Sequence, residues 1–171
     1  MLTSFHALFR AMLDAAVPTA AVVRGQCLGG GLELASFCTR VFAAPDAHFG
    51  QPEMSLGVFA PAASVLLPYR VSQPAAEDLL FSGRMVGADE ALAMGMVNQV
   101  VPADRLLEEA RAYAAKLVAT SSPWSMRSMK AQLYADLDAS MHEAYERAVT
   151  LADTSVLGDD FKEGLKALIE K

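Results

Sequence analysis

The sequence has few cysteines and no long apolar segment, and both shortages argue against whole classes of protein. Cys27 and Cys38 are the only cysteines, and both have apolar neighbours. We interpret them as small buried residues in a reducing compartment, so neither a disulfide framework nor a cysteine metal site is expected. No run of about eighteen apolar residues occurs, so no transmembrane helix is expected. The N-terminus also lacks a basic region before a long apolar core, so we expect no secretory signal and a cytoplasmic protein.

Positive charge is scarce as well. The chain has 14 Lys and Arg residues against 20 Asp and Glu residues, which gives a formal net charge of −6 at pH 7. This balance argues against nucleic acid or a membrane surface as a general partner. A polyanionic ligand would need local basic groups, because the overall charge repels it. With 53% hydrophobic and 20% charged residues, the 171-residue chain is long and apolar enough for one globular domain with a sizeable core.

Three consecutive glycines, residues 29–31, lie where a predicted strand gives way to a predicted helix. Residues 20–23 are apolar on both faces, as in a strand of a sheet that is covered on both sides. After the glycines, apolar residues recur at helical spacing from Leu34 to Val41. Backbone N–H groups at the start of a helix lack intrahelical partners, and the helix dipole adds partial positive charge. The turn is therefore suited to bind an anion, or an oxygen on which negative charge develops.

Three familiar motifs with glycine turns do not fit this one. A phosphate-binding loop needs Lys and then Ser or Thr after its last glycine, but Leu32 and Glu33 follow here. In a dinucleotide-binding turn that starts at Gly29, Leu34 would take the place of the third small residue. The Gly-x-Ser-x-Gly turn of many serine hydrolases does not occur. The carboxylate of Glu33 would repel a phosphate, and it suits acid–base chemistry beside a polarised carbonyl instead.

Two carboxylates are the candidate acid and base. Glu33 lies within one turn of the glycines, and Glu53 follows Pro52 in a segment rich in apolar residues. In an apolar pocket, desolvation would raise the pKa of Glu53. Each residue has a structural alternative, because Glu33 could cap its helix and Glu53 could be an exposed loop acid. The residue pattern leaves these alternatives open.

Three separated segments occur in a fixed order with suggestive spacing. They read PTAAVV at residues 18–23, LGGGLELA at residues 28–35 and FGQPE at residues 49–53, followed by Leu56 and Gly57. Together they resemble the centre of the crotonase family, the enoyl-CoA hydratases and isomerases. The likeness continues through residues 80–84, 88–101 and 163–165, and so extends over nearly the whole chain.

The resemblance implies an α/β fold, in which a crotonase-like core of ββα spiral turns precedes a helical trimerisation region. It implies that Gly30 supplies one oxyanion-hole N–H to a thioester carbonyl and that Glu33 and Glu53 form the acid–base pair. It also implies substrate-binding roles for four residues nearby, Leu28, Gly29, Pro52 and Gly57. The substrate would be an acyl-CoA thioester, so coenzyme A would arrive with it and no other cofactor or metal would be needed.

Two features depart from the family's pattern. Family members carry a further region, with a second oxyanion donor, before the point where this sequence starts. We therefore expect the C-terminal two-thirds of the fold, truncated at its N-terminus, with residues 1–101 in the spiral core and residues 102–171 in a helical oligomerisation region. After Gly57, residues 58–65 replace a glycine-rich run and resemble hydratases of cyclic dienoyl-CoA esters. Phe59 would suit the wall of a pocket for an alicyclic acyl group. The alternative, that Phe59 packs in the hydrophobic core, is equally consistent with the sequence.

The predicted function is hydration of an α,β-unsaturated acyl-CoA thioester. The presence of two candidate carboxylates, Glu33 and Glu53, favours a hydratase over a double-bond isomerase, because an isomerase can work with a single carboxylate. A non-catalytic acyl-CoA binder is the alternative from another class, because nothing before Gly25 resembles the second donor's motif. For the same reason we expect these residues alone to be weakly active or inactive. Apolar stripes over residues 102–171 exceed what one small sheet can cover, and with the resemblance they predict a homotrimer or hexamer.

Overall fold

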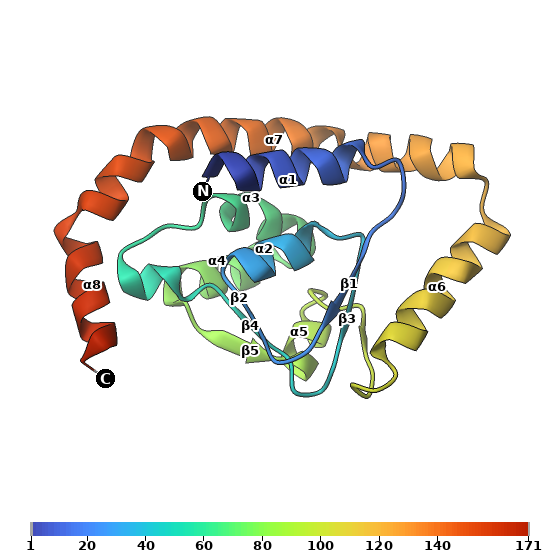
Figure 1. The fold of residues 1–171 in the computed structure, drawn as a ribbon, viewed down its shortest axis with the longest axis horizontal. Helices are drawn as coiled ribbons and strands as arrows, with labels where there is room; N and C mark the ends of the chain where they lie inside the picture. Colours follow the sequence, from blue (N-terminus) through green and yellow to red (C-terminus); the bar gives the residue numbers. More distant parts are fainter. Residues whose placement is uncertain (1, 171) are drawn as a thin grey trace.

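The computed structural model describes the backbone of residues 2–170 and the side chains of residues 4–151 and 158–170 (Figure 1). The helices are α1 (Leu2–Asp14), α2 (Gly30–Phe37), α3 (Pro61–Arg70), α4 (Gln73–Ser82), α5 (Ala88–Ala93), α6 (Leu106–Thr120), α7 (Pro123–Leu157) and α8 (Asp159–Ile169), with a short 3₁₀-helix, η1, at Pro52–Leu56. The strands are β1 (Ala20–Val23), β2 (Gln26–Leu28), β3 (Arg40–Ala43), β4 (His48–Gly50), β5 (Met85–Gly87) and β6 (Gln99–Val100).

The strands form two small sheets, and β1 to β4 belong alternately to one and the other. One sheet has the order β1-β3-β6 with parallel pairing, and the other has the order β2-β4-β5. Strands β2 and β4 are parallel, whereas β4 and β5 are antiparallel. Since β1 pairs with β3 and β2 pairs with β4, the unit β1-β2-α2 is followed by a second two-strand unit stacked beside it. This confirms the predicted α/β architecture of successive ββα turns.

Strand β1 corrects one expectation about the sheet. Residues 20–23 were expected to be covered on both faces, but Val22 is 40% exposed and Ala20 is exposed too. Side chains alternate between the faces of a strand, so Ala21 and Val23 share the other face, which packs against the main core. Among the described strands, β1 has a neighbour on one side only, whereas β3 lies between β1 and β6 and is buried. The doubly covered position therefore belongs to β3.

The main core lies between the two sheets and helices α2 to α5. Its members include Leu32, Val41, Phe49, Leu67 and Leu79. Cys27 and Cys38 are free and buried, as predicted. Burial raises the pKa of the Cys27 thiol to about 11, and the neighbouring Cys38 adds to the shift.

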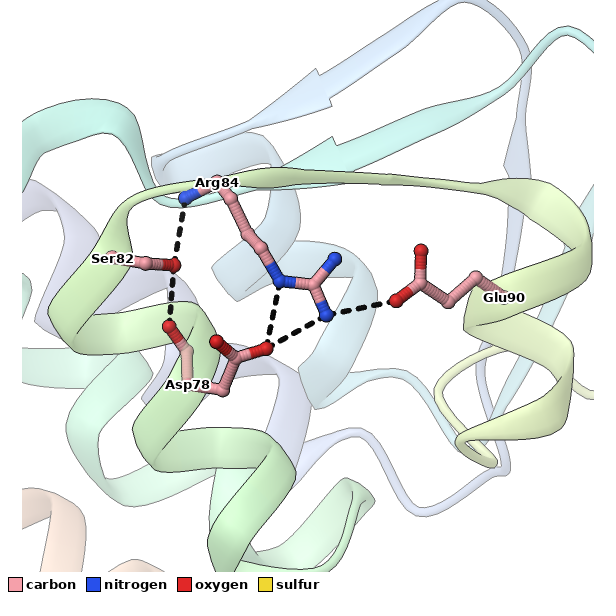
Figure 2. A network of polar contacts seen from close by, with 4 residues as sticks. All are labelled: Asp78, Ser82, Arg84 and Glu90. Atoms are coloured by element: carbon pink, nitrogen blue, oxygen red, sulfur yellow. Dashed lines mark hydrogen bonds and ion pairs between the residues drawn. The ribbon is translucent and has the colours of Figure 1, made fainter.

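An exposed polar network joins α4, β5 and α5 beside this core (Figure 2). Arg84 donates to Asp78 at 2.7 Å and to Glu90 at 2.8 Å, and its backbone N–H donates to the hydroxyl of Ser82 at 3.1 Å. The carbonyl oxygen of Arg84 lies only 2.9 Å from the position that a Cβ at Gly50 would occupy. Exposed ion pairs stabilise a fold only weakly. The main effect of the network is therefore to orient Arg84 and to keep the start of β5 against β4.

The C-terminal helices wrap around this α/β unit. Helix α7 runs along α1 and over α3, and α8 turns down beside η1 (Figure 1). Only some apolar residues of the predicted stripes are buried, and Leu133 is 67% exposed. The buried ones are Leu106, Ala110, Leu137, Met141, Ala144 and Ala148. Ala152, which continues one predicted stripe, lies outside the described side chains. Among the helices in the described part of the chain, none combines the length and apolarity needed to cross a membrane.

Candidate functional site

Gly29 forms the turn between β2 and α2, and two constraints require glycine there. Its backbone has φ 53° and ψ −126°, a conformation that side chains disfavour. A Cβ at this position would lie 1.9 Å from Oε1 of Glu53. The carboxylate of Glu53 therefore occupies the space beside the Cα of Gly29 that any other residue would fill. The Gly29 N–H donates to the carbonyl of Gly50 at 3.0 Å, which fixes the turn against β4.

The next two glycines have different surroundings. Gly30 is the first residue of α2, so its N–H has no helical carbonyl to bond. A Cβ on Gly30 would lie 2.6 Å from Cζ of Phe5, an aromatic residue of α1. A Cβ on Gly31 would meet nothing within 4 Å in the described part of the chain. The start of α2 thus presents the Gly30 peptide between Phe5 and the carboxylate of Glu53, with open space beside Gly31.

Glu33 lies on α2 and is only 9% exposed. Its Oε1 accepts a hydrogen bond from the N–H of Ala63, at the start of α3, at 3.0 Å. Burial raises the pKa of Glu33, the Ala63 N–H lowers it, and the nearby charge of Glu53 raises it. Glu33 makes no capping bond, because its Oε1 bonds α3 and the N–H of the capping residue Gly29 bonds Gly50. It does lie in the first turn of α2, so the second part of the structural alternative, an acid that complements the helix dipole, still applies.

Glu53 lies on η1, which begins at Pro52. The alternative of an exposed loop acid is wrong, because the residue is half-buried with one carboxylate oxygen against Gly29. Its other oxygen, Oε2, is buried and has no hydrogen-bond partner among the described residues. An acceptor in this state is suited to a water molecule or a ligand donor.

The remaining predicted site residues lie around this centre. Leu28, partly buried, ends β2 directly before Gly29. Gly57 ends η1 at φ 68°, and a Cβ there would lie 2.8 Å from the carbonyl carbon of Asp160. It therefore faces the start of α8. Phe59 is half-buried between η1 and α3, and its predicted contact with an acyl group stays a prediction.

Three groups at the site received no role from the sequence. They are the ring of Phe5, the side chain of Gln51 and the N–H of Ala63. Gln51 is fully buried and its Nε2 lies 3.3 Å from the carbonyl oxygen of Gly29. The FGQPE segment that contains Gln51 was a signal that could have found it. No sequence signal pointed to Phe5 or Ala63, because their contacts with residues 30–33 depend on the tertiary fold.

Comparison with known proteins identifies the family of the chain. A family model described as enoyl-CoA hydratase/isomerase matches residues 2–171. The chain belongs to this family. The resemblance to crotonases is thereby confirmed, and with it the crotonase fold.

Relatives in the family are similar along the whole chain. Cyclohexa-1,5-dienecarbonyl-CoA hydratase of Thauera aromatica is 43% identical over 173 residues, which cover 100% of this chain and 66% of the relative. A putative enoyl-CoA hydratase of Thermus thermophilus is 38% identical over 98% of this chain and 66% of its own length. The chain thus spans about two thirds of the length of these relatives.

Solved structures of the family have the same fold. An enoyl-CoA hydratase from Mycobacterium avium subsp. paratuberculosis gives a TM-score of 0.89 at 25% identity, over 99% of this chain and 69% of that one. An enoyl-CoA hydratase/isomerase from Pseudoalteromonas atlantica gives a TM-score of 0.86 at 30% identity, over 95% of this chain and 65% of that one.

Proposed function

We propose that this protein hydrates the double bond of an α,β-unsaturated acyl-CoA thioester. The observation that carries the proposal is the position of the Glu53 carboxylate against Gly29, the residue that precedes Gly30. The second carboxylate, Glu33, is near enough for the charge of Glu53 to affect its ionisation. Addition of water beside a carbonyl needs a hydrogen-bond donor for the carbonyl oxygen and groups that take up and deliver protons. The Gly30 N–H and the two carboxylates can supply these.

The proposed reaction uses these groups in separate roles. The Gly30 N–H, together with a second donor, polarises the thioester carbonyl and stabilises the enolate-like transition state. Glu33 takes a proton from water as the hydroxyl adds to the β-carbon, and Glu53 delivers a proton to the α-carbon. Burial raises the pKa of Glu33 and so makes it a stronger base near neutral pH. Proton exchange with solvent then restores both carboxyl groups.

The acyl group we propose is alicyclic. The Thauera aromatica relative is named for a cyclic dienoyl-CoA substrate. Phe59 is half-buried next to η1, where an aromatic side chain could form one wall of the acyl pocket. Leu28, Gly29, Pro52 and Gly57 would complete the surroundings of the substrate.

The second part of the proposal is that residues 102–171 form an oligomerisation region. Several large apolar side chains of α6 and α7 are exposed: Leu107, Val118, Trp124, Met129 and Leu133. A partner of the same chain, in a homotrimer or a hexamer, would cover them. Sedimentation at micromolar concentration is expected to give a trimer or larger, and a well-behaved monomer would contradict this.

A single-turnover assay tests the reaction even if turnover is slow. The purified chain, in excess over substrate, is mixed with crotonyl-CoA or cyclohexa-1,5-diene-1-carbonyl-CoA, and products are identified by mass spectrometry and NMR. A gain of one water indicates a hydratase, with faster addition to the cyclic ester expected. A shifted double bond without mass change would indicate an isomerase. Binding without any reaction would indicate an acyl-CoA binder.

A further inference from the structure

Gln51 is a fully buried polar side chain next to the glycine turn, with 0% of its surface exposed. Its side-chain Nε2 lies 3.3 Å from the carbonyl oxygen of Gly29. A carbonyl oxygen only accepts hydrogen bonds, so the side-chain NH₂ of Gln51 must be the donor. The other side-chain atom, Oε1, is buried and has no hydrogen-bond partner among the described residues. Burying a half-satisfied amide costs stability, so apolar packing alone does not explain a glutamine here.

The bond from Gln51 acts on the peptide group that contains the Gly30 N–H. The carbonyl of Gly29 and the N–H of Gly30 belong to one planar trans peptide and point in opposite directions. Fixing the oxygen therefore fixes the direction of the N–H. The same oxygen also accepts the N–H of Glu33 at 3.0 Å. Two donors on the carbonyl polarise the peptide and make its N–H a better donor.

The turn needs such a restraint because glycine does not restrain itself. Gly29 has φ 53° and ψ −126°, and without a side chain its peptides can rotate at low cost. The peptide on its N-terminal side is held by the bond from the Gly29 N–H to the carbonyl of Gly50. Gln51 directly follows Gly50, the last residue of β4, so two consecutive residues at the end of β4 hold the peptides on both sides of Gly29.

We propose that Gln51 is a positioning residue whose side-chain amide locks the Gly29–Gly30 peptide and so aims the Gly30 N–H at the substrate carbonyl. The conformational part concerns the protein alone. The catalytic consequence rests on the proposed function, since it needs a thioester oxygen at the Gly30 N–H.

The first test uses the unaltered chain in solution. The side-chain NH₂ protons of Gln51 are expected to exchange with solvent at least tenfold more slowly than those of Gln73, which lies exposed on α4 and bonds Glu77. Equal exchange rates at the two residues would overturn the proposal. This measurement needs no substrate, so it decides the conformational part even if the protein binds no acyl-CoA.

The second test removes the donor and keeps the volume. In Gln51→Met the ¹H–¹⁵N signal of Gly30 is expected to shift and its amide to exchange at least tenfold faster, while amides of α4 stay unchanged. Gln73→Met is the matched control and should leave Gly30 unaffected. An unchanged Gly30 amide in a less stable Gln51→Met protein would mean that Gln51 only fills the core, and would overturn the proposal.

The third test reads the direction of the N–H through a ligand. A conjugated dienoyl-CoA absorbs at longer wavelength when its carbonyl is polarised, and this shift on binding should be smaller in Gln51→Met. The single-turnover rate constant should fall roughly 10–100-fold, less than complete removal of an oxyanion donor, with the Kd of the dienoyl-CoA changed little. A full wavelength shift and full rate in the variant would contradict the aiming role.

Discussion

The glycine turn of residues 28–33 and the long helix α7 obtain their packing in opposite ways. At the turn, backbone and carboxylate approach so closely that Gly29 has no room for a single additional carbon atom. Along α7, apolar residues such as Trp124, Met129 and Leu133 are largely exposed, whereas Leu137 and Met141 are buried. The turn therefore depends on a few residues that nothing else can replace. The helix depends on many interchangeable contacts, and we expect substitutions in the two regions to differ sharply in effect.

The largest expected difference concerns the two carboxylates. Glu33→Gln and Glu53→Gln should each lower the rate of hydration by about 10²–10⁴-fold, because each removes a proton donor or acceptor. Single-turnover kinetics measures this effect. Glu108→Gln, an exposed residue of α6, is the matched control and should keep the rate of the unaltered chain. Full activity in Glu33→Gln would remove Glu33 from the proposed chemistry.

Substitutions of neighbouring glycines should rank next. Gly29→Ala forces a side chain into a positive-φ conformation, which alone costs roughly 1–3 kcal/mol, and it also displaces Glu53. We expect a lower free energy of unfolding in urea and a loss of activity. Gly31→Ala is the control, since no described residue lies within 4 Å of a Cβ there. Equal stability of the two variants would show that the turn relaxes more easily than its geometry suggests.

Lys130 joins α7 to the end of α1, and its replacement should give a moderate effect. It is 7% exposed, and its Nζ donates to the carbonyls of Met12, Ala15 and Val17 at 2.7, 2.5 and 2.8 Å. Lys130→Met leaves these carbonyls at the end of α1 without their charged partner, a loss of about 1–3 kcal/mol in unfolding free energy. Urea unfolding of the variant is the measurement.

The exposed Lys116 of α6 supplies the comparison for this experiment. Lys116→Met should unfold at the same urea concentration as the unaltered chain. If Lys130→Met does so too, the three hydrogen bonds of Lys130 do not stabilise the packing of α7 on α1, which then rests on apolar contacts and on the Arg10–Asp138 ion pair.

The smallest predicted effect is a pH dependence of stability at Glu33. Its pKa is raised by burial from the ordinary 4.5, so the folded state holds this proton more tightly than the unfolded state. The associated stability is present below pH 4.5 and is lost as pH rises through the raised pKa. Glu33→Gln should therefore unfold at higher temperature than the unaltered chain near pH 7, with the difference shrinking towards pH 4. A variant less stable than the unaltered chain near pH 7, with the deficit shrinking towards pH 4, would instead indicate that the ionised carboxylate stabilises the fold.

The sequence predicted the centre of the site well because local pattern and family likeness coincide there. The glycine turn, the helix after it and the second carboxylate lie within residues 28–53, and the structure brings Glu53 against Gly29. Whether these residues catalyse a reaction stays a prediction. The strands β2, β4 and β5 were not predicted, because three residues are too few for a periodic pattern.

What the sequence missed depends on contacts between distant segments. Phe5 reaches Gly30 because α1 packs against α2, where the rings of Phe9 and Phe37 lie 4.9 Å apart, and Ala63 reaches Glu33 because α3 packs on α2. The exposed face of β1 was missed for a related reason. Its apolar residues indicate a strand, but whether a strand is central or at an edge is decided by pairing with segments far along the chain.

The close packing of α8 on η1 has a consequence for the order of events during synthesis. Gly164 lies so near η1 that a Cβ would be 2.8 Å from the Cα of Leu56, and Gly57 approaches Asp160 equally closely. The ribosome makes the segment that carries Glu53 long before it makes the helix that covers it. Chains begin to fold as they emerge from the ribosome, so η1 is exposed on the side that α8 later covers. The candidate site is therefore completed late, when α8 docks, and a nascent chain interrupted before residue 158 would hold Glu53 on a less constrained turn.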